Sequence, residues 1–126
     1  MQSIYTDGSC IPNPGPGGWG FIFISSTEIW KVNGGSRQTT NNQMELTAVI
    51  EALKFTDETN IKIFSDSQYV INCAKGKWKR KTNLELWAQF DHASNKKKIE
   101  WEWVKAHNGN RWNEQVDQLA KNGVPA

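Results

Sequence analysis

Residues 42–66 have the sequence NQMELTAVIEALKFTDETNIKIFSD, in which a helical spacing of apolar residues gives way to a strand-like alternation. The first part predicts an amphipathic helix from Asn42 to Phe55, with Asn41 or Asn42 as its N-cap. The positions that follow the i, i+3, i+4, i+7 spacing are Glu45, Ala48, Val49 and Ala52. The second part, Ile61–Asp66, alternates like a strand. A helix that leads directly into a strand is typical of an α/β fold.

Upstream of this unit the sequence predicts strands. Gly18–Ile24 and Ile29–Val32 are rich in β-forming residues, and the polar residues 25–28 between them favour a hairpin turn. Ser3–Asp7 is predicted as a further strand. The intervening residues 11–18 hold three of the four prolines and three glycines, so we expect a structured loop there.

Downstream, helices and one strand alternate. We expect a short helix over Ser67–Ala74, a longer one over Leu84–Ala93, a strand over Ile99–Val104 and a final helix over Asn113–Lys121. The whole order predicts an α/β domain with one sheet covered by helices.

Composition limits what the chain can be. Its 126 residues suit one domain, and 37% hydrophobic content without a long apolar run excludes a bilayer-spanning segment. No secretory signal follows Met1, so we expect a cytoplasmic protein with reduced thiols at Cys10 and Cys73. The net charge is only +2, yet five of the seven residues 75–81 are basic, so positive charge is concentrated locally.

Four carboxylates stand at positions that suggest chemistry. Glu45 lies on the apolar stripe of its helix, Asp7 and Asp66 end strands, and Asp117 lies beside apolar residues of the last helix. Strand ends at a crevice are where open α/β sheets bind ligands. Taken singly, each has an ordinary explanation: a turn aspartate for Asp7, an N-cap for Asp66, and solvated helix charges for the other two.

The residues around these carboxylates resemble the type 1 ribonuclease H family, the hybrid-specific ribonucleases H, in family order from about Ile4 to Ala120. The matching motifs are YTDGSC at 5–10, NPGPGG at 13–18, TTNNQMEL at 39–46, SDSQYV at 65–70 and WEWVKAH at 101–107. The resemblance implies a ribonuclease H-like fold: a five-stranded mixed sheet, its first three strands antiparallel, with helices on both faces. It also implies that residues 1–126 form a single catalytic domain, an endonuclease that hydrolyses the RNA strand of RNA–DNA hybrids.

The resemblance further implies a metal site and a mechanism. Asp7, Glu45, Asp66 and Asp117 would hold two Mg²⁺ ions, or Mn²⁺ as a substitute, with Asp7 bridging the two. Two such ions about 3.5 to 4 Å apart can activate water and stabilise the leaving oxygen. The products would carry 5′-phosphate and 3′-hydroxyl ends. His107 would assist proton transfer or product release, against the alternative of a solvated loop histidine.

Substrate contacts are implied in the same way. Amide side chains suit the RNA 2′-hydroxyl, which both donates and accepts, and the four implied amides are Asn13, Asn41, Asn42 and Gln68. Asn13 is equally suited to a turn, and Asn41 and Asn42 to helix capping. Thr40 would help to hold a DNA-strand phosphate. Gln38 stands where the family often has arginine, so a weaker phosphate contact is expected.

The basic segment near residues 75–83 matches a longer basic protrusion of many cellular members and looks abbreviated. Lys77, Trp78 and Lys79 would contact the DNA backbone there, whereas the alternative is a solvated turn. We assign four further tryptophans to packing: Trp87, Trp101, Trp103 and Trp112. His92 has no matching motif and is assigned to a structural or surface role.

Two other functions stay open. The chain could be a hybrid-binding module with little catalysis, as part of a larger reverse-transcriptase-like protein, or a related strand transferase. The amide motifs disfavour the transferase. The expected partner is an RNA–DNA hybrid, without membrane association, and a monomer is the default for this size.

Overall fold

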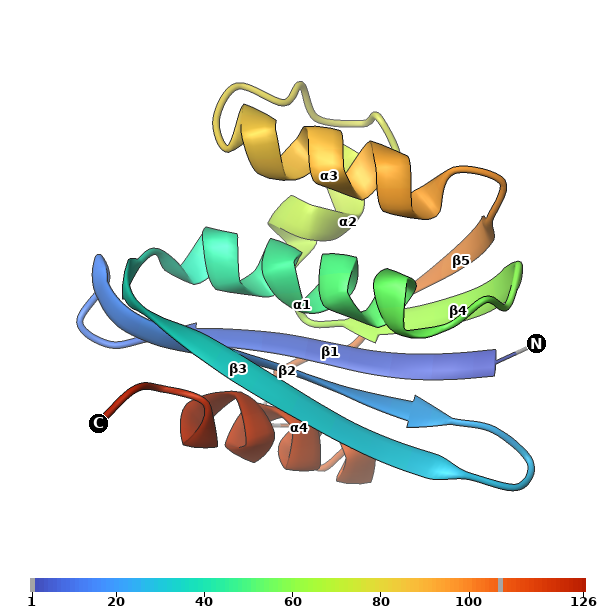
Figure 1. The fold of residues 1–126 in the computed structure, drawn as a ribbon, viewed down its shortest axis with the longest axis horizontal. Coiled ribbons are helices and arrows are strands. Elements are labelled where there is room, and N and C mark those ends of the chain that lie inside the picture. The colour runs from blue at the N-terminus through green and yellow to red at the C-terminus, as the bar shows by residue number, and fades with distance from the viewer. Residues whose placement is uncertain (1, 107) are drawn as a thin grey trace.

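A computed structural model describes residues 2–106 and 108–126, which form a five-stranded sheet and four helices (Figure 1). The elements are β1 (Gln2–Cys10), β2 (Gly15–Ile24), β3 (Ile29–Thr39), α1 (Asn41–Phe55), β4 (Asn60–Ser65), α2 (Gln68–Ala74), α3 (Leu84–Ser94), β5 (Lys98–Trp103) and α4 (Arg111–Asn122). The sheet order is β3-β2-β1-β4-β5. β1, β2 and β3 pair antiparallel, and β1–β4 and β4–β5 pair parallel, which confirms the predicted fold class.

Helices cover both faces of the sheet, as Figure 1 shows, with α1, α2 and α3 on one side and α4 on the other. Successive side chains of a strand point to opposite faces, so β1 contributes to two cores. Ile4 packs in the larger core beneath α1, and its neighbour Tyr5 packs with Val116 of α4 in the smaller one. β1 continues to Cys10, because its last residues pair with β2, so Asp7 lies within a strand that is buried on both sides and not at the strand's end as predicted.

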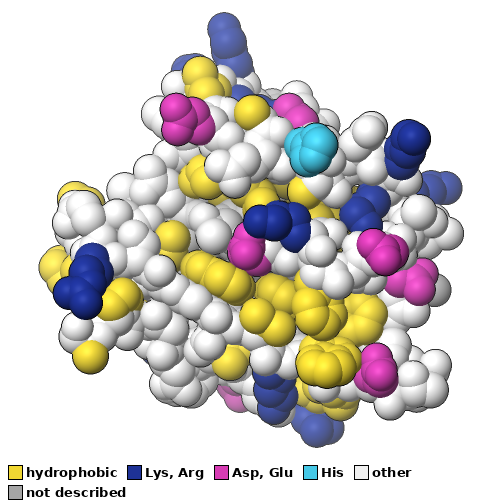
Figure 2. All heavy atoms as spheres, in the orientation of Figure 1, with side chains coloured by type: hydrophobic (Ala, Val, Ile, Leu, Met, Phe, Trp, Pro, Cys, Tyr) yellow, Lys and Arg dark blue, Asp and Glu magenta, His cyan; other side chains and the backbone are white. Residues whose placement is uncertain are grey.

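An aromatic cluster continues the larger core to the surface. Phe55, at the end of α1, contacts the rings of Phe21, Phe23 and Trp30 at centroid distances of 5.3, 5.6 and 5.9 Å. Figure 2 shows hydrophobic side chains gathered on this face of the molecule. Phe55 and Trp30 are 41% and 49% exposed, so the cluster closes the core at this end only partly.

The predicted loop is shorter than expected. Residues 15–18 belong to β2, where Gly17 and Gly18 pair with Cys10 and Ser9 of β1, so only residues 11–14 are a loop. The ladder with β3 shifts register between Gly15 and Gly17, around Pro16. Proline lacks the N–H that a regular ladder requires, and an irregularity at that residue lets the strand continue past it.

Helix caps also differ from the prediction. The N-cap of α1 is Thr40, whose hydroxyl accepts a hydrogen bond from the backbone N–H of Gln43, while the Gln43 side chain accepts from Thr40 N–H. This reciprocal capping box satisfies two N–H groups at once, so Asn41 lies inside the helix. At α2 the N-cap is Ser67, and therefore Asp66 is not a capping residue.

Gly8 lets α1 lie directly against β1. A Cβ atom at this position would collide with the backbone of Met44 and Glu45. The helix therefore approaches the strand at the one place where the strand has no side chain in the way. Because Gly8 directly follows Asp7, this close approach places the backbone of Glu45 beside the residue next to Asp7.

Other sequence expectations can be compared with the fold directly. Trp87 is buried and Trp112 packs against the smaller core, as predicted, while His92 is exposed on α3. Cys10 and Cys73 are free and buried. Among the residues that the structure describes, no helix has the length and apolar character needed to cross a membrane.

Candidate functional site

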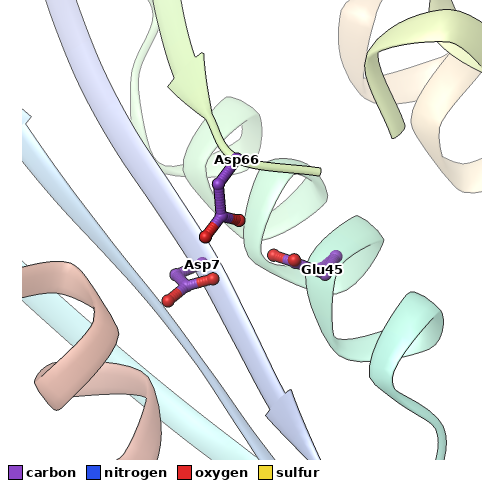
Figure 3. Close-up of side chains that lie close together, drawn as sticks. All are labelled: Asp7, Glu45 and Asp66. Carbon is purple, nitrogen blue, oxygen red and sulfur yellow. The ribbon is translucent and has the colours of Figure 1, made fainter. Parts of the chain in front are cut away.

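Three of the four predicted carboxylates meet where β1 passes the end of β4. Asp7 comes from β1, Glu45 from α1, and Asp66 from the residue after β4 (Figure 3). One ligand oxygen from each lies within 4.8 Å of the others. Asp7 and Glu45 are only 3% and 7% exposed. The fold therefore concentrates three acidic groups in one largely buried place.

Their protonation follows from this crowding. Burial, and next the charge of Asp66, raise the pKa of Asp7 from 3.8 to about 8. Burial, followed by the charge of Asp7, raises the pKa of Glu45 well above its usual value, and burial likewise raises the pKa of Asp66. A cation bound between these three carboxylates would favour their ionised forms.

The donor set fits a divalent cation. The buried Glu45 Oε1 has no hydrogen-bond partner among the described residues, and Asp7 Oδ1 accepts only from the N–H of Gly8, at 2.9 Å. A buried polar atom without a partner is costly. Hard cations such as Mg²⁺ prefer carboxylate oxygens, so these three side chains have the right chemistry to hold one.

Asp117 lies beside this cluster and outside it. Its carboxylate on α4 forms an ion pair with Lys121 at 3.1 Å and is partly exposed. The charge of Asp117 is nevertheless among the causes that raise the pKa of Asp7, so the two carboxylates interact electrostatically. The structure thus brings together three predicted ligands and places the fourth at the edge of their site.

His107, the predicted proton-transfer residue, lies outside the described residues. The segment that follows is described: Gly109 has a φ of +77° and Asn110 caps α4, its Oδ1 accepting from Asn113 N–H at 2.9 Å.

The raised pKa values predict an unusual pH dependence for the metal-free protein. In the folded protein Asp7 holds its proton up to about pH 8. In the unfolded chain its carboxyl has an ordinary pKa and loses the proton near pH 3.8. The folded state therefore binds more protons between these values, and the free energy of unfolding falls as pH rises through them. Urea unfolding from about pH 5 to about pH 9 in chelator should show this decline, and saturating Mg²⁺ should oppose it, because cation binding stabilises the folded state. Asp7→Asn should flatten the decline; a wild-type stability that rises over this range would contradict the assignment.

The predicted substrate residues fall into two places. Asn13, Thr40, Asn41 and Asn42 line one depression of about 480 Å³, and the Asn13 Oδ1 accepts from Asn41 N–H at 3.1 Å. The exposed Gln68 instead lines a second depression, between α2 and β5. Asn13 therefore has a structural contact with the start of α1 as well as an exposed position.

The first depression includes a residue that the sequence did not single out. Asn83 has a left-handed backbone, with φ of 56°, and its side chain is held from both sides. Its Oδ1 accepts from Gln43 Nε2 at 3.2 Å, and its Nδ2 donates to the Tyr69 hydroxyl at 3.0 Å. Nothing in its neighbourhood along the chain signals this role, because its partners lie 14 and 40 residues away.

Within the basic segment, Arg80 differs from its neighbours. Its guanidinium bonds both oxygens of Asp91 at 2.9 Å, donates from Nε to the Cys73 carbonyl oxygen, and lies over the Trp87 ring at 4.3 Å. Lys77, Trp78 and Lys79 are exposed. Arg80 therefore anchors the segment to α3, and its neighbours face solvent.

The packing prediction for Trp103 is wrong. Trp101 packs against the larger core, but Trp103, two residues further on the same face of β5, is 46% exposed. It lies at the end of β5. The alternation of side chains along a strand predicts which face each one is on, but not whether a helix covers that face.

The capping role of Thr40 can be separated from any role in substrate contact. Thr40→Ala should destabilise the protein by about 1 kcal/mol, because the N-cap hydrogen bond is lost. Thr40→Ser retains a hydroxyl at that position and should restore most of the stability. Chemical denaturation of both variants measures this; an alanine variant as stable as wild type would contradict the cap.

Comparisons with known proteins agree with this geometry. The model of a family described as RNase H matches residues 1–125. The ribonuclease H of Ehrlichia ruminantium is 45% identical to the chain, over 96% of this chain and 92% of the relative.

Solved structures show the same fold. The N-terminal RNase H domain of a Mycobacterium tuberculosis protein has a TM-score of 0.86 and 26% identity, covering 97% of this chain and 91% of that one. LC11-RNase H1, crystallised in complex with an RNA/DNA hybrid, has a TM-score of 0.85 and 23% identity, covering 98% and 96%. With the family match along nearly the whole sequence, these findings confirm the resemblance to type 1 ribonucleases H, and the chain belongs to the RNase H family.

Proposed function

We propose that the protein is a metal-dependent endonuclease that hydrolyses the RNA strand of RNA–DNA hybrids. The carrying observation is the meeting of Asp7, Glu45 and Asp66 within 4.8 Å, with a buried Glu45 oxygen that has no partner among the described residues. Membership of the RNase H family supports the reaction class. The complex of LC11-RNase H1 with a hybrid supports the substrate by analogy.

In catalysis, the chain's own residues would hold the metal ions and orient the substrate phosphate. Two divalent ions bound here would supply a more acidic water and neutralise charge on the phosphate. Asp7, Glu45 and Asp66 would hold the ions, and Asp7 would contribute oxygen to both, as the family resemblance implies. Asp117 would complete the set from α4 by exchanging its contact with Lys121 for the ions. Mg²⁺ is the proposed metal, with Mn²⁺ as a substitute.

The proposed reaction is a single displacement at phosphorus. The oxygen of a water molecule bonds to the phosphorus and loses a proton, while the bond from phosphorus to the ribose O3′ breaks and O3′ gains a proton. The products are a 3′-hydroxyl on one fragment and a 5′-phosphate on the other. We assign proton transfer or product release to His107.

Recognition of the RNA strand is proposed for the exposed amides. Asn13, Asn42 and Gln68 are exposed, and Asn42 and Gln68 lie three residues before Glu45 and two after Asp66, so these amides would reach 2′-hydroxyls in a minor groove. Thr40 and Asn83 share the first depression, where a DNA-strand phosphate would be bound. Lys77, Trp78 and Lys79 would contact the DNA backbone beyond it. The cytoplasmic location and the monomeric state stay predictions.

The test is cleavage of a hybrid whose strands carry different end labels, beside an RNA duplex and a DNA duplex, with Mg²⁺, Mn²⁺ or chelator. We expect cutting of the RNA strand in the hybrid alone, in metal alone, with 5′-phosphate ends. Tight binding of the hybrid without cutting in either metal would favour a hybrid-binding module. Cutting of the DNA strand, or cutting in chelator, would overturn the proposal.

A further inference from the structure

A second depression adjoins the carboxylate cluster, between α2 and β5. This α2–β5 pocket has a volume of about 300 Å³. Its lining includes two lysines, two tryptophans and two amides: Lys75, Lys77, Trp101, Trp103, Gln68 and Asn72. Aromatic faces, cations and amides thus surround one cavity.

Trp103 gives the pocket a fixed aromatic surface. Its side chain is 46% exposed, yet its Nε1 donates a hydrogen bond to the backbone carbonyl oxygen of Asp66 at 3.2 Å. Its backbone is paired with Ser65 in the parallel ladder, and Val104 N–H donates to the Ser65 carbonyl oxygen at 3.0 Å. The indole is therefore oriented before any ligand arrives, and it is bonded to the backbone of a candidate metal ligand.

The two lysines are available for an anion. Within the described part of the chain, neither Lys75 nor Lys77 forms an ion pair, and both are exposed. The backbone that carries them is nevertheless held, because the N–H groups of Lys77 and Trp78 both donate to the Asn72 carbonyl oxygen, at 2.9 and 3.2 Å. Arg80 anchors the end of the same segment. The cations are thus presented beside the pocket on a tethered backbone.

We propose that the α2–β5 pocket binds an unpaired nucleotide of the cleaved strand, with its base on the Trp103 indole and its phosphate at Lys75. Proteins bind single-stranded nucleic acid by combining aromatic stacking with cations along the backbone. A paired base inside a duplex is stacked on both faces and cannot cover an indole, whereas an unpaired one can. The proposal rests on the proposed function, which places the cleaved strand at Asp66, next to the pocket.

The pocket predicts a preference for hybrids that carry a single-stranded RNA flank. Base stacking on one aromatic residue corresponds to about a 5- to 100-fold change in affinity, so flanked hybrids should bind more tightly than blunt hybrids by that factor. The measurement is fluorescence anisotropy of labelled hybrids in chelator, where no cleavage is expected, with 5′-flanked, 3′-flanked and blunt hybrids of equal paired length.

Variants identify the pocket as the cause. Trp103→Leu should remove the preference and leave the affinity for the blunt hybrid unchanged, and Trp103→Phe, which keeps a ring, should retain most of it. The control Trp30→Leu removes a tryptophan of similar exposure, 49%, on β3 and should behave like wild type. Lys75→Gln should weaken binding of the flanked hybrid and make it less sensitive to salt. Circular dichroism checks that each variant is folded.

Several results would overturn the proposal. Equal binding of flanked and blunt hybrids by wild type would do so, as would an unchanged preference in Trp103→Leu. Equal weakening of both hybrids in Trp103→Leu would assign the indole to the duplex backbone instead. A flank preference without cleavage in metal would leave the pocket standing and reject the nuclease activity, whereas cleavage without any preference would do the reverse.

Discussion

Asp66→Asn should lower cleavage of an RNA–DNA hybrid in Mg²⁺ by more than about 100-fold, since even the partners of metal ligands contribute 10- to 100-fold. The amide is neutral and is a poorer ligand for a hard cation than the carboxylate. The side chain extends from the end of β4 toward Asp7 and Glu45, so the substitution changes the site without removing a packing group (Figure 3). Single-turnover cleavage at saturating enzyme measures the chemical step.

The same substitution should stabilise the metal-free protein near neutral pH. The charge of Asp66 is a cause of the raised pKa values of both Asp7 and Glu45, and its removal relieves that repulsion. Asp57→Asn, in the exposed turn after α1, is the matched control and should alter neither property. Activity of Asp66→Asn within a few-fold of wild type would reject the role given to this residue.

Gly8→Ala should destabilise the protein by about 3 kcal/mol or more, at the upper end of the range for overpacked cores. The added Cβ would collide with the backbone of Met44 and Glu45, and backbone of a helix cannot rotate away as a side chain can. Alanine otherwise favours a strand over glycine, so the loss arises from this contact alone. Equilibrium urea unfolding measures the change.

The matched control is Gly20→Ala in β2. Its Cβ would meet the Ala120 backbone nitrogen at 3.1 Å and Leu119 Cγ at 3.1 Å, which small movements can relieve. We expect a cost of about 1 kcal/mol there. Gly8→Ala should also weaken divalent-cation binding, because the added methyl group would push α1 away from β1 and would move Glu45 away from Asp7 and Asp66. Equal stability of the two variants would show that the close approach of α1 to β1 is unimportant.

Much of the fold follows from local sequence patterns. The periodicity of residues 42–55 predicted α1, and the polar turn at residues 25–28 predicted the hairpin of β2 and β3. Local patterns failed where pairing partners decide the structure. Residues 15–18 have a loop composition, yet they join β2 because β1 and β3 lie on both sides and supply hydrogen bonds.

The candidate site was predicted in part for the same reason. Glu45 stood out as a charge on an apolar stripe, and the structure buries it beside Asp7 and Asp66. The side chain of Asn83 is held by Gln43 and Tyr69, which are distant in the chain. The indole of Trp103 is exposed because no helix of the described residues covers it at the end of β5. Such positions are determined by tertiary packing, which no spacing along the sequence records.

The most direct test of the metal site is anomalous diffraction from a crystal of the wild-type protein soaked in MnCl₂. We expect anomalous density between the carboxylates of Asp7, Glu45 and Asp66, and we expect the Glu45 oxygen that has no hydrogen-bond partner among the described residues to be one of the metal's ligands. Density confined to other sites at saturating Mn²⁺, with these carboxylates unliganded, would contradict it.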